Sequence, residues 1–341
     1  MHPVNDIYII DTTNTNPYIN LAMEEYLYEH FIEGTAILFL WQNANTIVIG
    51  QNQSAYSQCE ISEVKKAGIL IARRRSGGGA VYHDLGNLNY TFISQNKPKV
   101  CADNFNIILQ MLKDVGLDAE FSGRNDILID GKKVSGNAFL CDDKKMCHHG
   151  TLLVDSDQDM MYRLLRIDNE KWKDKGIKSA KGRTENLKHY LPNVSVDLLK
   201  DLLKKEFCSF YSGATIHEGV DKQSSLFDKE ELEKLVKKYS SSEWIFEKQF
   251  EENLHIQKRF NWGQITISMN IRKNIIEEIA FLSDAMDTAI IENVTQRLEK
   301  ASFCVDSILN VFTELEERYE SNQILRDIKD LLIVEVPENR R

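Results

Sequence analysis

The sequence predicts an α/β (α+β) protein with a mixed, largely antiparallel sheet, followed by a smaller α/β domain. Strand-like and helix-like segments are mixed without the regular β-α-β order of a Rossmann fold. A chain of 341 residues is long enough for roughly two domains, the larger with a sizeable core. Strand-like alternation starts again near residue 245, so we expect a catalytic domain over 1–245 and a small accessory domain over 246–341.

Most of the predicted strands lie in the first domain. Residues 16–31 predict a helix, because Asn16 can cap it and Pro17 suits its first position. Residues 80–93 are typical of a hairpin that turns at 84–86. Short apolar segments predict further strands at 7–11, 36–42, 46–50 and 68–73.

The middle of the chain continues this mixture of strands and helices. Residues 103–117 have the apolar spacing of an amphipathic helix, with Asp103 at the cap position. Residues 125–140 predict a hairpin around Gly131. We also expect a strand at 148–155, an exposed loop at 171–188, helices at 195–210 and 228–240, second-domain strands within 255–284, and helices at 294–300, 305–315 and 324–334.

Composition and charge argue against several classes of protein. The formal net charge of -10 disfavours broad nonspecific nucleic-acid binding, which depends on positive charge. The N-terminus lacks the basic start and apolar core of a signal peptide, and no apolar run approaches the roughly 20 residues that span a bilayer. The six cysteines form no CxxC pair of a zinc or redox motif, and scattered thiols suit a reducing cytoplasm. We therefore expect a cytoplasmic protein without membrane or nucleic-acid partners.

The segment RRRSGGGAVYHD at 73–84 is the first candidate site. Three consecutive glycines let backbone N–H groups approach an anion closely, and the arginines before them can add charged hydrogen bonds. The segment has neither the GK[ST] ending of a Walker A loop nor the GxGxxG spacing of a dinucleotide fingerprint. It suits a phosphate or a carboxylate, and the alternative is a glycine-rich hairpin whose arginines face solvent.

The second candidate is Lys133, which follows a tight turn on a predicted strand. The small residues Ser135, Gly136 and Ala138 lie beside it, and they leave open space for a ligand that the ammonium group could contact. The alternative is a solvent-facing strand lysine, since lysine is rarely buried without a partner. Lys132 would face the opposite side of the strand.

Two polar pairs complete the set of candidates. The tract RNDI could place Asn125 or Asp126 near a magnesium ion or a ribose, although such tracts usually serve turns. His148 and His149 point to opposite faces of a strand, so they form a poor chelating pair. We therefore expect His149 to act by hydrogen bonding or packing and not by metal binding.

Taken together, four segments closely resemble the lipoate–protein ligase A family, within the biotin/lipoate protein ligases. The motifs RRxSGGGAVxHD and KVSG are highly specific, which favours ligand binding by Arg74 and Lys133 over the solvent-facing alternatives. The resemblance extends over the whole chain, including RFNWGQI in the second domain. The four segments are LFLWQNANTIVIGQNQ, ARRRSGGGAVYHDLGN, SGRNDILIDGKKVSGNAF and HHGTLL.

This resemblance implies the catalytic fold of biotin protein ligases and a reaction in two steps. ATP and lipoate first give lipoyl-AMP and pyrophosphate, with magnesium assisting. The lipoyl group then passes to one lysine of a lipoyl domain. The implied acceptors are the acyltransferase subunits of 2-oxoacid dehydrogenases and the glycine cleavage H protein. We expect the ligase itself to be a monomer.

The resemblance also implies roles for individual residues. Lys133 would contact both the carboxyl and the phosphate sides of the adenylate and is the catalytic residue. Residues 175–187 match the family's adenylate-binding loop, which would fold over the intermediate and shield it from water. The implied nucleotide contacts are Arg74, Gly77, Gly78, Gly79, Ala80, Val81 and Tyr82. The implied substrate contacts are Trp41, which would wall the lipoyl tunnel, with His83, Asn125, Asp126, Gly136, Ala138, His149 and Thr151; Asp126 is also a candidate for magnesium.

Two other functions stay open at the level of sequence. An octanoyl- or lipoyl-transferase of the same fold needs no ATP and can use a cysteine thiolate, for which Cys141 and Cys147 are candidates. The adenylate-loop match and the C-terminal domain argue against a transferase. A noncatalytic lipoate-binding protein is the other alternative, and it predicts ligand binding without pyrophosphate release.

Overall fold

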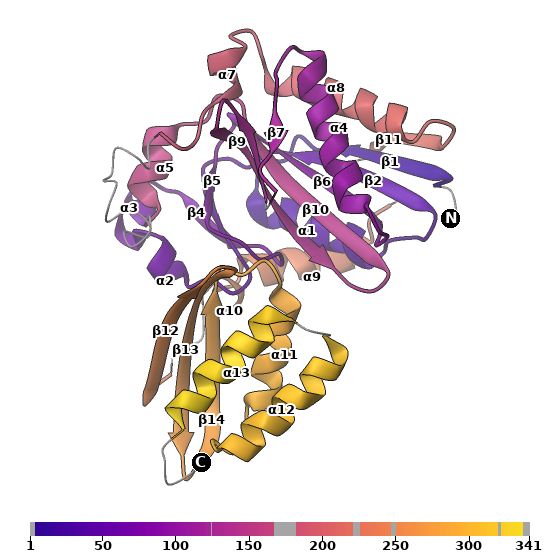
Figure 1. Ribbon diagram of the computed structural model, residues 1–341. Coiled ribbons are helices and arrows are strands. Elements are labelled where there is room, and N and C mark those ends of the chain that lie inside the picture. Colours follow the sequence, from indigo (N-terminus) through magenta and orange to yellow (C-terminus); the bar gives the residue numbers. More distant parts are fainter. Residues whose placement is uncertain are drawn as a thin grey trace. The chain divides into compact units, whose positions relative to one another are not determined.

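The chain forms two compact units (Figure 1). The computed structural model describes residues 4–123, 125–166, 182–220, 226–246, 250–319 and 322–336. The first unit comprises Met1–Ile49, Ala55–Arg75 and Ala80–Phe246. The second comprises Gly50–Ser54, Ser76–Gly79 and Glu247–Arg341. The second unit therefore includes two short segments from the first half of the sequence, and one of them contains the three glycines.

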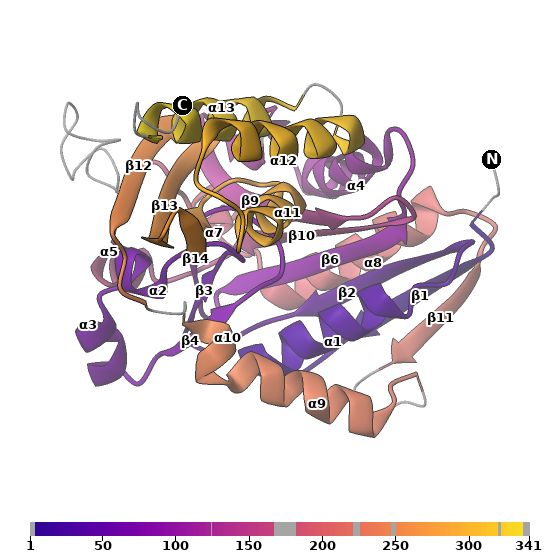
Figure 2. The ribbon, with the colours of Figure 1, turned by 90° about the horizontal axis from the view of Figure 1, so that it is seen from below.

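An eight-stranded sheet forms the centre of the first unit, in the order β11-β1-β2-β6-β10-β9-β8-β7. Figure 2 shows the strands from β11 to β9 in this order. The pairs β11–β1 and β1–β2 are parallel, and the other five pairs are antiparallel. This arrangement confirms the prediction of a mixed, largely antiparallel sheet. The strands are β1 (Asp6–Asp11), β2 (Thr35–Trp41), β6 (Asn87–Gln95), β7 (Glu120–Phe121), β8 (Asp126–Ile129), β9 (Lys132–Cys141), β10 (Lys145–Leu153) and β11 (Thr215–Val220).

The predicted hairpin at 80–93 is wrong, because its two strands belong to different sheets, one of which is a second sheet of three strands. The order of this second sheet is β4-β3-β5, so β5 pairs with β3, whereas β6 pairs with β2 and β10 in the large sheet. The predicted turn exists, since the Asn87 amide donates to the Asp84 carbonyl at 3.1 Å. However, a Cβ at Gly86 would collide with the backbone of Asp155, and the Asp155 amide donates to the Gly86 carbonyl at 2.9 Å. This packing directs the chain into the large sheet. The strands are β3 (Thr46–Ile49), β4 (Leu70–Arg73) and β5 (Val81–His83).

Helices cover both faces of the large sheet (Figure 2). Buried side chains of α1 (Pro17–Glu29) and α9 (Lys229–Ser240) pack on one face, and those of α4 (Val100–Asp114) and α8 (Val196–Phe210) pack on the other. Among the described residues, no helix has both the length and the apolar character needed to cross a membrane. The short helices of this unit are α2 (Ala55–Gln58), α3 (Ile61–Lys66), α5 (Gln158–Leu164), α7 (Leu187–Tyr190) and α10 (Ser242–Ile245).

Two helix starts test the capping predictions. The side chain of Asn16 accepts a hydrogen bond from the Tyr18 amide at 2.9 Å, so the predicted cap of α1 is confirmed. Helix α4 begins at Val100, and Asp103 therefore lies in its first turn and is not the cap. The Asp103 amide already bonds to the Lys99 carbonyl at 2.8 Å, as expected inside a helix.

The hairpin at Gly131 is confirmed, because β8 and β9 are antiparallel neighbours. Asp130 and Gly131 both have positive φ angles, of 49° and 70°, which suits a tight hairpin turn ending in glycine. The predicted loop at 171–188 falls mostly on residues 171–181, which lie outside the described part of the chain.

The second unit has its own small antiparallel sheet, in the order β12-β13-β14, and a separate apolar core. The predicted strands and the three predicted helices are present, although the first helix begins earlier than expected. Its capping residue is Asp287, whose side chain accepts from the Ile290 amide at 3.2 Å. The elements are β12 (Leu254–Phe260), β13 (Gly263–Arg272), β14 (Ile275–Ser283), α11 (Thr288–Leu298), α12 (Val305–Arg318) and α13 (Gln323–Glu335).

Candidate functional site

One face of the large sheet collects several residues that the sequence singled out. Side chains of residues paired on neighbouring strands point to the same face. Trp41 on β2 and Thr151 on β10 both pair with Asn89 on β6. His149 lies two residues before Thr151 and pairs with Ala138 on β9. Trp41, Ala138, His149 and Thr151 therefore share the face that α1 covers.

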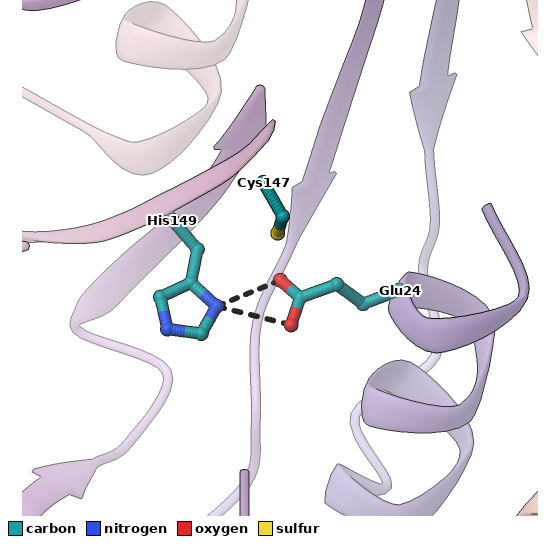
Figure 3. A group of neighbouring side chains, drawn as sticks. All are labelled: Glu24, Cys147 and His149. Carbon is teal, nitrogen blue, oxygen red and sulfur yellow. Dashed lines mark hydrogen bonds and ion pairs between the residues drawn. The ribbon is translucent and has the colours of Figure 1, made fainter. Parts of the chain in front are cut away.

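A glutamate from α1 joins this group of side chains. The Nδ1 atom of His149 lies 3.0 Å from both carboxylate oxygens of Glu24 (Figure 3). The Thr91 hydroxyl donates to Oε1 of Glu24 at 2.6 Å, and Nε1 of Trp41 donates to the Thr91 hydroxyl at 3.0 Å. A continuous chain of polar contacts thus runs from Trp41 through Thr91 and Glu24 to His149.

Electrostatic interactions lower the pKa of Glu24 although its side chain is buried. Burial alone would raise the pKa of Glu24, but the charge and hydrogen bond of His149, the bond from Thr91 and the charge of Arg74 together lower it. Burial lowers the pKa of Arg74 to about 10, while Glu24 opposes that shift. Glu24 is therefore a carboxylate at neutral pH, and the charge of the buried Arg74 guanidinium acts on it.

The three consecutive arginines have different environments. Arg73 donates from Nη2 to the Ile245 carbonyl at 2.6 Å, so it holds the end of α10. Arg75 pairs through Nη1 with Oε1 of Glu29 at 2.5 Å. Arg74 is buried and interacts with Glu24. Arg74 adds positive charge at Glu24, and the charge of Arg75 acts on the Cys147 thiol of the same face.

His83 contributes a buried imidazole beside Arg74. Its Nδ1 lies 3.2 Å from Nδ2 of Asn43, whose Oδ1 accepts from Asn20 at 3.0 Å. Because the Asn43 amide nitrogen can only donate, the neutral ring carries its proton on Nε2. Burial, followed by the charges of Arg74 and His149, lowers the His83 pKa to about 3. Among the described residues Nε2 has no hydrogen-bond partner, so His83 presents a buried donor.

Lys133 lies in a second polar group, built on β8 and β9. Its Nζ is 2.7 Å from Oδ1 of Asp126, and Oδ2 of the same carboxylate is 3.0 Å from Nη2 of Arg183. A Cβ at Gly136 would approach Nζ of Lys133 to 2.7 Å. Part of the open space expected beside Lys133 is therefore filled by its own ammonium group.

The end of the expected adenylate-binding loop runs beside this lysine. The Lys133 amide donates to the Arg183 carbonyl at 2.8 Å. Lys132, which the sequence assigned to the opposite side of the strand, donates from its side chain to the carbonyl of Gly182. Residues 175–181 of that loop lie outside the described residues.

Thr151 and Asn125 act on the backbone around Lys133. The Gly136 amide donates to the hydroxyl of Thr151 at 3.2 Å, which ties β9 to the polar face. Asn125 exchanges bonds with Asn137, since Asn137 N donates to Asn125 O at 2.8 Å and Asn125 Nδ2 donates to Asn137 O at 3.2 Å. Asn125 therefore holds the entry to β8.

His148 lies on the opposite face of β10 from His149. It packs against Phe105 and Phe139, and its Nε2 is 2.8 Å from Oδ1 of Asn137. Burial lowers its pKa to about 3. The two histidines thus lie on opposite faces of β10, as the strand spacing predicted, and Nδ1 of His149 is within hydrogen-bond distance of Glu24.

The glycine run divides into packed and open positions. The Gly78 amide donates to the Ala285 carbonyl at 3.2 Å, and a Cβ at Gly77 would collide with that same carbonyl oxygen. A Cβ at Gly79 would meet no atom within 4 Å. After Ala80, the residues Val81 and Tyr82 enter β5, which is an outer strand of the small sheet.

Glu24 and Thr91, which link Trp41 to His149, were not identified from the sequence. Glu24 lies on the apolar face of α1, three residues after Leu21 and four before Tyr28, and this placement of a carboxylate was the available signal. Thr91 lies in the middle of a buried strand, where nothing in the sequence sets it apart.

Comparison with known proteins shows the family to which this chain belongs. Residues 16–208 match the lipoyl protein ligase A/B catalytic domain, and residues 249–332 match the bacterial lipoate protein ligase C-terminus. A lipoate-protein ligase A of Psychrobacter cryohalolentis is 34% identical over 333 residues, which cover 96% of this chain and 98% of that protein.

Solved structures similar to this chain carry relevant ligands. The lipoate complex of LipL1 from P. falciparum superposes with a TM-score of 0.83 at 29% identity and covers 97% of this chain and 100% of its own. A bipartite ligase from Thermoplasma acidophilum, described with its E2 lipoyl domain, has a TM-score of 0.61 at 29% identity. The match covers 74% of this chain and 100% of that chain. A lipoate-protein ligase A bound with ATP reaches 0.58 at 27% identity, with coverage of 70% and 97%.

Proposed function

This chain belongs to the lipoyl protein ligase A/B family, and we propose that it activates lipoate with ATP and transfers the lipoyl group to a lysine of a lipoyl domain. The observation that carries this proposal is the position of Lys133. Its ammonium is held by Asp126 at 2.7 Å, over a glycine, beside the described end of the expected adenylate loop. A cation held in a fixed position suits a reaction between two anions.

In the first step, a carboxylate oxygen of lipoate attacks the α-phosphorus of ATP. The new acyl–phosphate bond forms as the bond to pyrophosphate breaks, giving lipoyl-AMP. Both reactants are negatively charged, so the barrier includes their repulsion. Lys133 reduces that repulsion by lying between the carboxylate and the phosphate, and a preorganised cation is most effective where water is excluded.

In the second step, the lysine amine of the acceptor attacks the acyl carbon of lipoyl-AMP. An amide bond forms, AMP leaves with the bonding electrons, and the amine loses a proton to solvent. Lys133 stabilises the leaving phosphate with the same charge. A single cation can therefore serve both steps, because the carboxyl and phosphate oxygens remain adjacent throughout.

The nucleotide contacts are proposed around the glycine run and β5. Gly79 suits a close approach of phosphate, since nothing crowds the position of its missing side chain. Ala80, Val81 and Tyr82 follow directly, and the outer edge of β5 offers backbone groups to the nucleotide. Arg74 adds charge, and the buried Nε2–H of His83 suits an acceptor oxygen of the adenylate.

The lipoyl group is proposed to lie along the polar face of β2, β6 and β10. Trp41 provides an apolar wall, and its ring is fixed by the bond to Thr91. Ala138 leaves room because it is small, and the Lys133 ammonium occupies the space beside Gly136, while His149 and Thr151 flank them on β10. This arrangement gives an apolar ligand one aromatic wall and a small number of fixed polar groups.

Magnesium is proposed to enter with ATP. Asp126 does not fit as a ready metal ligand, because Lys133 and Arg183 already occupy its two oxygens. When bound, the ion would offset charge on the triphosphate, as Mg²⁺ commonly does with substrate phosphates and retained waters. Asp126 would serve the ion only after releasing one of its two cations.

Acceptors are proposed to be the lipoyl domains of 2-oxoacid dehydrogenase acyltransferases, the glycine cleavage H protein, or both. The E2 lipoyl domain described with the T. acidophilum ligase supports this class of partner. We further propose that the protein acts as a monomer in the cytoplasm. None of the six cysteines, all of which lie in the described part of the chain, forms a disulfide, which is consistent with a reducing compartment.

The ATP-independent transferase is the alternative function, and the chemistry of the cysteines weighs against it. Cys147 is buried, and burial together with the charge of Glu24 raises its thiol pKa well above 9. Such a thiol is a poor nucleophile because it stays protonated. Cys141 is exposed on the last position of β9.

Mass spectrometry of an acceptor lipoyl domain tests the proposal. The domain should gain one lipoyl group when incubated with this protein, lipoate, magnesium and ATP. Omitting ATP should abolish the gain, and an octanoyl-carrier protein should not replace lipoate and ATP. Modification without ATP would instead support the transferase.

A further inference from the structure

Glu24, Cys147 and His149 come from distant parts of the sequence but meet in the interior of the first unit (Figure 3). One ligand atom from each residue lies within 4.8 Å of the other two. Helix α1 supplies the carboxylate, and β10 supplies the thiol and the imidazole from one face, since they are two residues apart. No sequence motif identifies these three residues as a cluster, because they lie on two elements that are far apart in the chain.

The donor atoms match a small, borderline-soft cation. Carboxylate oxygen, imidazole nitrogen and thiolate sulfur are the protein ligands of zinc, with bonds of about 2.0 to 2.3 Å. Tetrahedral coordination would place these atoms roughly 3.3 to 3.7 Å from one another. The Nδ1 atom of His149 is already 3.0 Å from both oxygens of Glu24, so the imidazole and the carboxylate need to separate only slightly.

Charge balance also suits a divalent ion. When a Zn²⁺–sulfur bond forms, the Cys147 thiol loses its proton to solvent, and the thiolate and the Glu24 carboxylate together supply two negative charges. Arg74 acts on the same carboxylate, Arg75 acts on the Cys147 thiol, and both charges oppose the ion. His149 and Glu24 each keep about a tenth of their side-chain surface exposed, whereas Cys147 is buried.

We propose that Glu24, Cys147 and His149 form a site for one Zn²⁺ ion. Three protein ligands leave a fourth coordination position for water or for an exogenous thiolate or carboxylate. Zinc would also draw Glu24 away from Thr91, which fixes Trp41, and this consequence for lipoate binding rests on the proposed function.

Cobalt(II) titration of the full chain tests the site without any ligase assay. Cobalt bound to a cysteine should give a thiolate-to-metal charge-transfer band in the near ultraviolet that saturates at one equivalent. Zinc should then displace the cobalt and abolish the band. The Cys147→Ser variant should lack the band, while the matched control Cys208→Ser should keep it. A band that persists in Cys147→Ser, or no band in the unmodified protein, would overturn the proposal.

A second variant keeps the test decisive if Cys147→Ser fails to fold. Glu24→Gln retains the shape of the side chain but removes one anionic ligand, and it should weaken zinc binding by at least about tenfold. Competition with a chromophoric chelator measures that affinity. Unchanged zinc affinity in Glu24→Gln would show that the ion binds elsewhere and would overturn the proposal. Ligase activity enters none of these measurements, so the site and the proposed function can fail independently.

Discussion

The Nζ atom of Lys133 lies 2.7 Å from Oδ1 of Asp126, and the pair sits over Gly136. The Asp126 carboxylate fixes the position of the Lys133 ammonium group. Most of both side chains is shielded from solvent, so this ion pair differs from a pair on the protein surface. A substrate anion would therefore meet a cation whose position is already fixed. This arrangement distinguishes Lys133 from an ordinary solvent-facing lysine.

Replacing Lys133 with alanine should nearly abolish adenylate formation. Loss of one preorganised charge from a reacting centre commonly reduces the rate by about 100- to 1,000-fold. Lipoate-dependent pyrophosphate release measures the effect, and circular dichroism checks the fold. The control Lys113→Ala, at an exposed position of α4, should retain normal activity. Wild-type turnover in Lys133→Ala would remove this residue from the mechanism.

The glycine run should separate into a structural and a functional position. Gly77→Ala should lower the free energy of unfolding, because the new Cβ would collide with the Ala285 carbonyl oxygen. Gly79→Ala should change stability by no more than about 0.5 kcal/mol, since nothing lies near its Cβ. Its KM for ATP should nevertheless rise if phosphates approach there. Urea unfolding and steady-state kinetics measure the two effects, and equal behaviour of the two variants would contradict this division.

The hydroxyl of Thr91 should matter for both stability and lipoate binding. Thr91→Val keeps the shape but removes the donor to Glu24 and the acceptor for Trp41, which leaves buried polar groups unpaired. Stability should fall by about 1 to 3 kcal/mol, and the KM for lipoate should rise. The exposed control Thr313→Val should change stability by less than about 0.5 kcal/mol. An unaffected KM would place Trp41 outside the lipoate site.

Two buried histidines should make stability depend on pH. His83 and His148 both have pKa values lowered from 6.5 to about 3 by burial. Between pH 3 and pH 6.5 the unfolded chain binds more protons than the folded protein. The contribution of the two histidines to the free energy of unfolding is therefore complete above pH 6.5 and is lost as the pH falls toward 3. Each can contribute a slope of up to about 1.4 kcal/mol per pH unit.

Denaturant unfolding between pH 7 and pH 5 measures this slope. His148→Gln should reduce the slope by removing one buried imidazole, whatever its effect on stability at neutral pH. The exposed control His189→Gln should leave the slope unchanged. A slope that is the same in all three proteins would show that these imidazoles do not remain neutral inside the fold.

Local patterns in the sequence predicted the elements well but not every pairing. The cap at Asn16 and the turn at Gly131 depend on nearby residues, and both were predicted correctly. The strands on either side of Asp84 were expected to pair, yet they enter different sheets because Gly86 packs against Asp155, about 70 residues away. Alternating hydrophobicity records which face is buried, not which strand lies alongside.

The candidate site shows the same division. The motif around Lys133 and the opposite faces of His148 and His149 could be predicted from local spacing. Glu24 could not be connected with His149, because helix α1 meets the sheet only after the chain has folded. The different environments of the three arginines also depend on helices that are distant in sequence. Arg73 contacts α10, and Arg75 contacts α1.

The most direct test of the ligase is to mix the purified protein with lipoate, magnesium and ATP, without any acceptor, and to measure pyrophosphate and bound adenylate. The proposed function predicts lipoate-dependent pyrophosphate release and lipoyl-AMP retained on the protein. Lipoate binding without pyrophosphate release would contradict the ligase and leave a binding protein or a transferase.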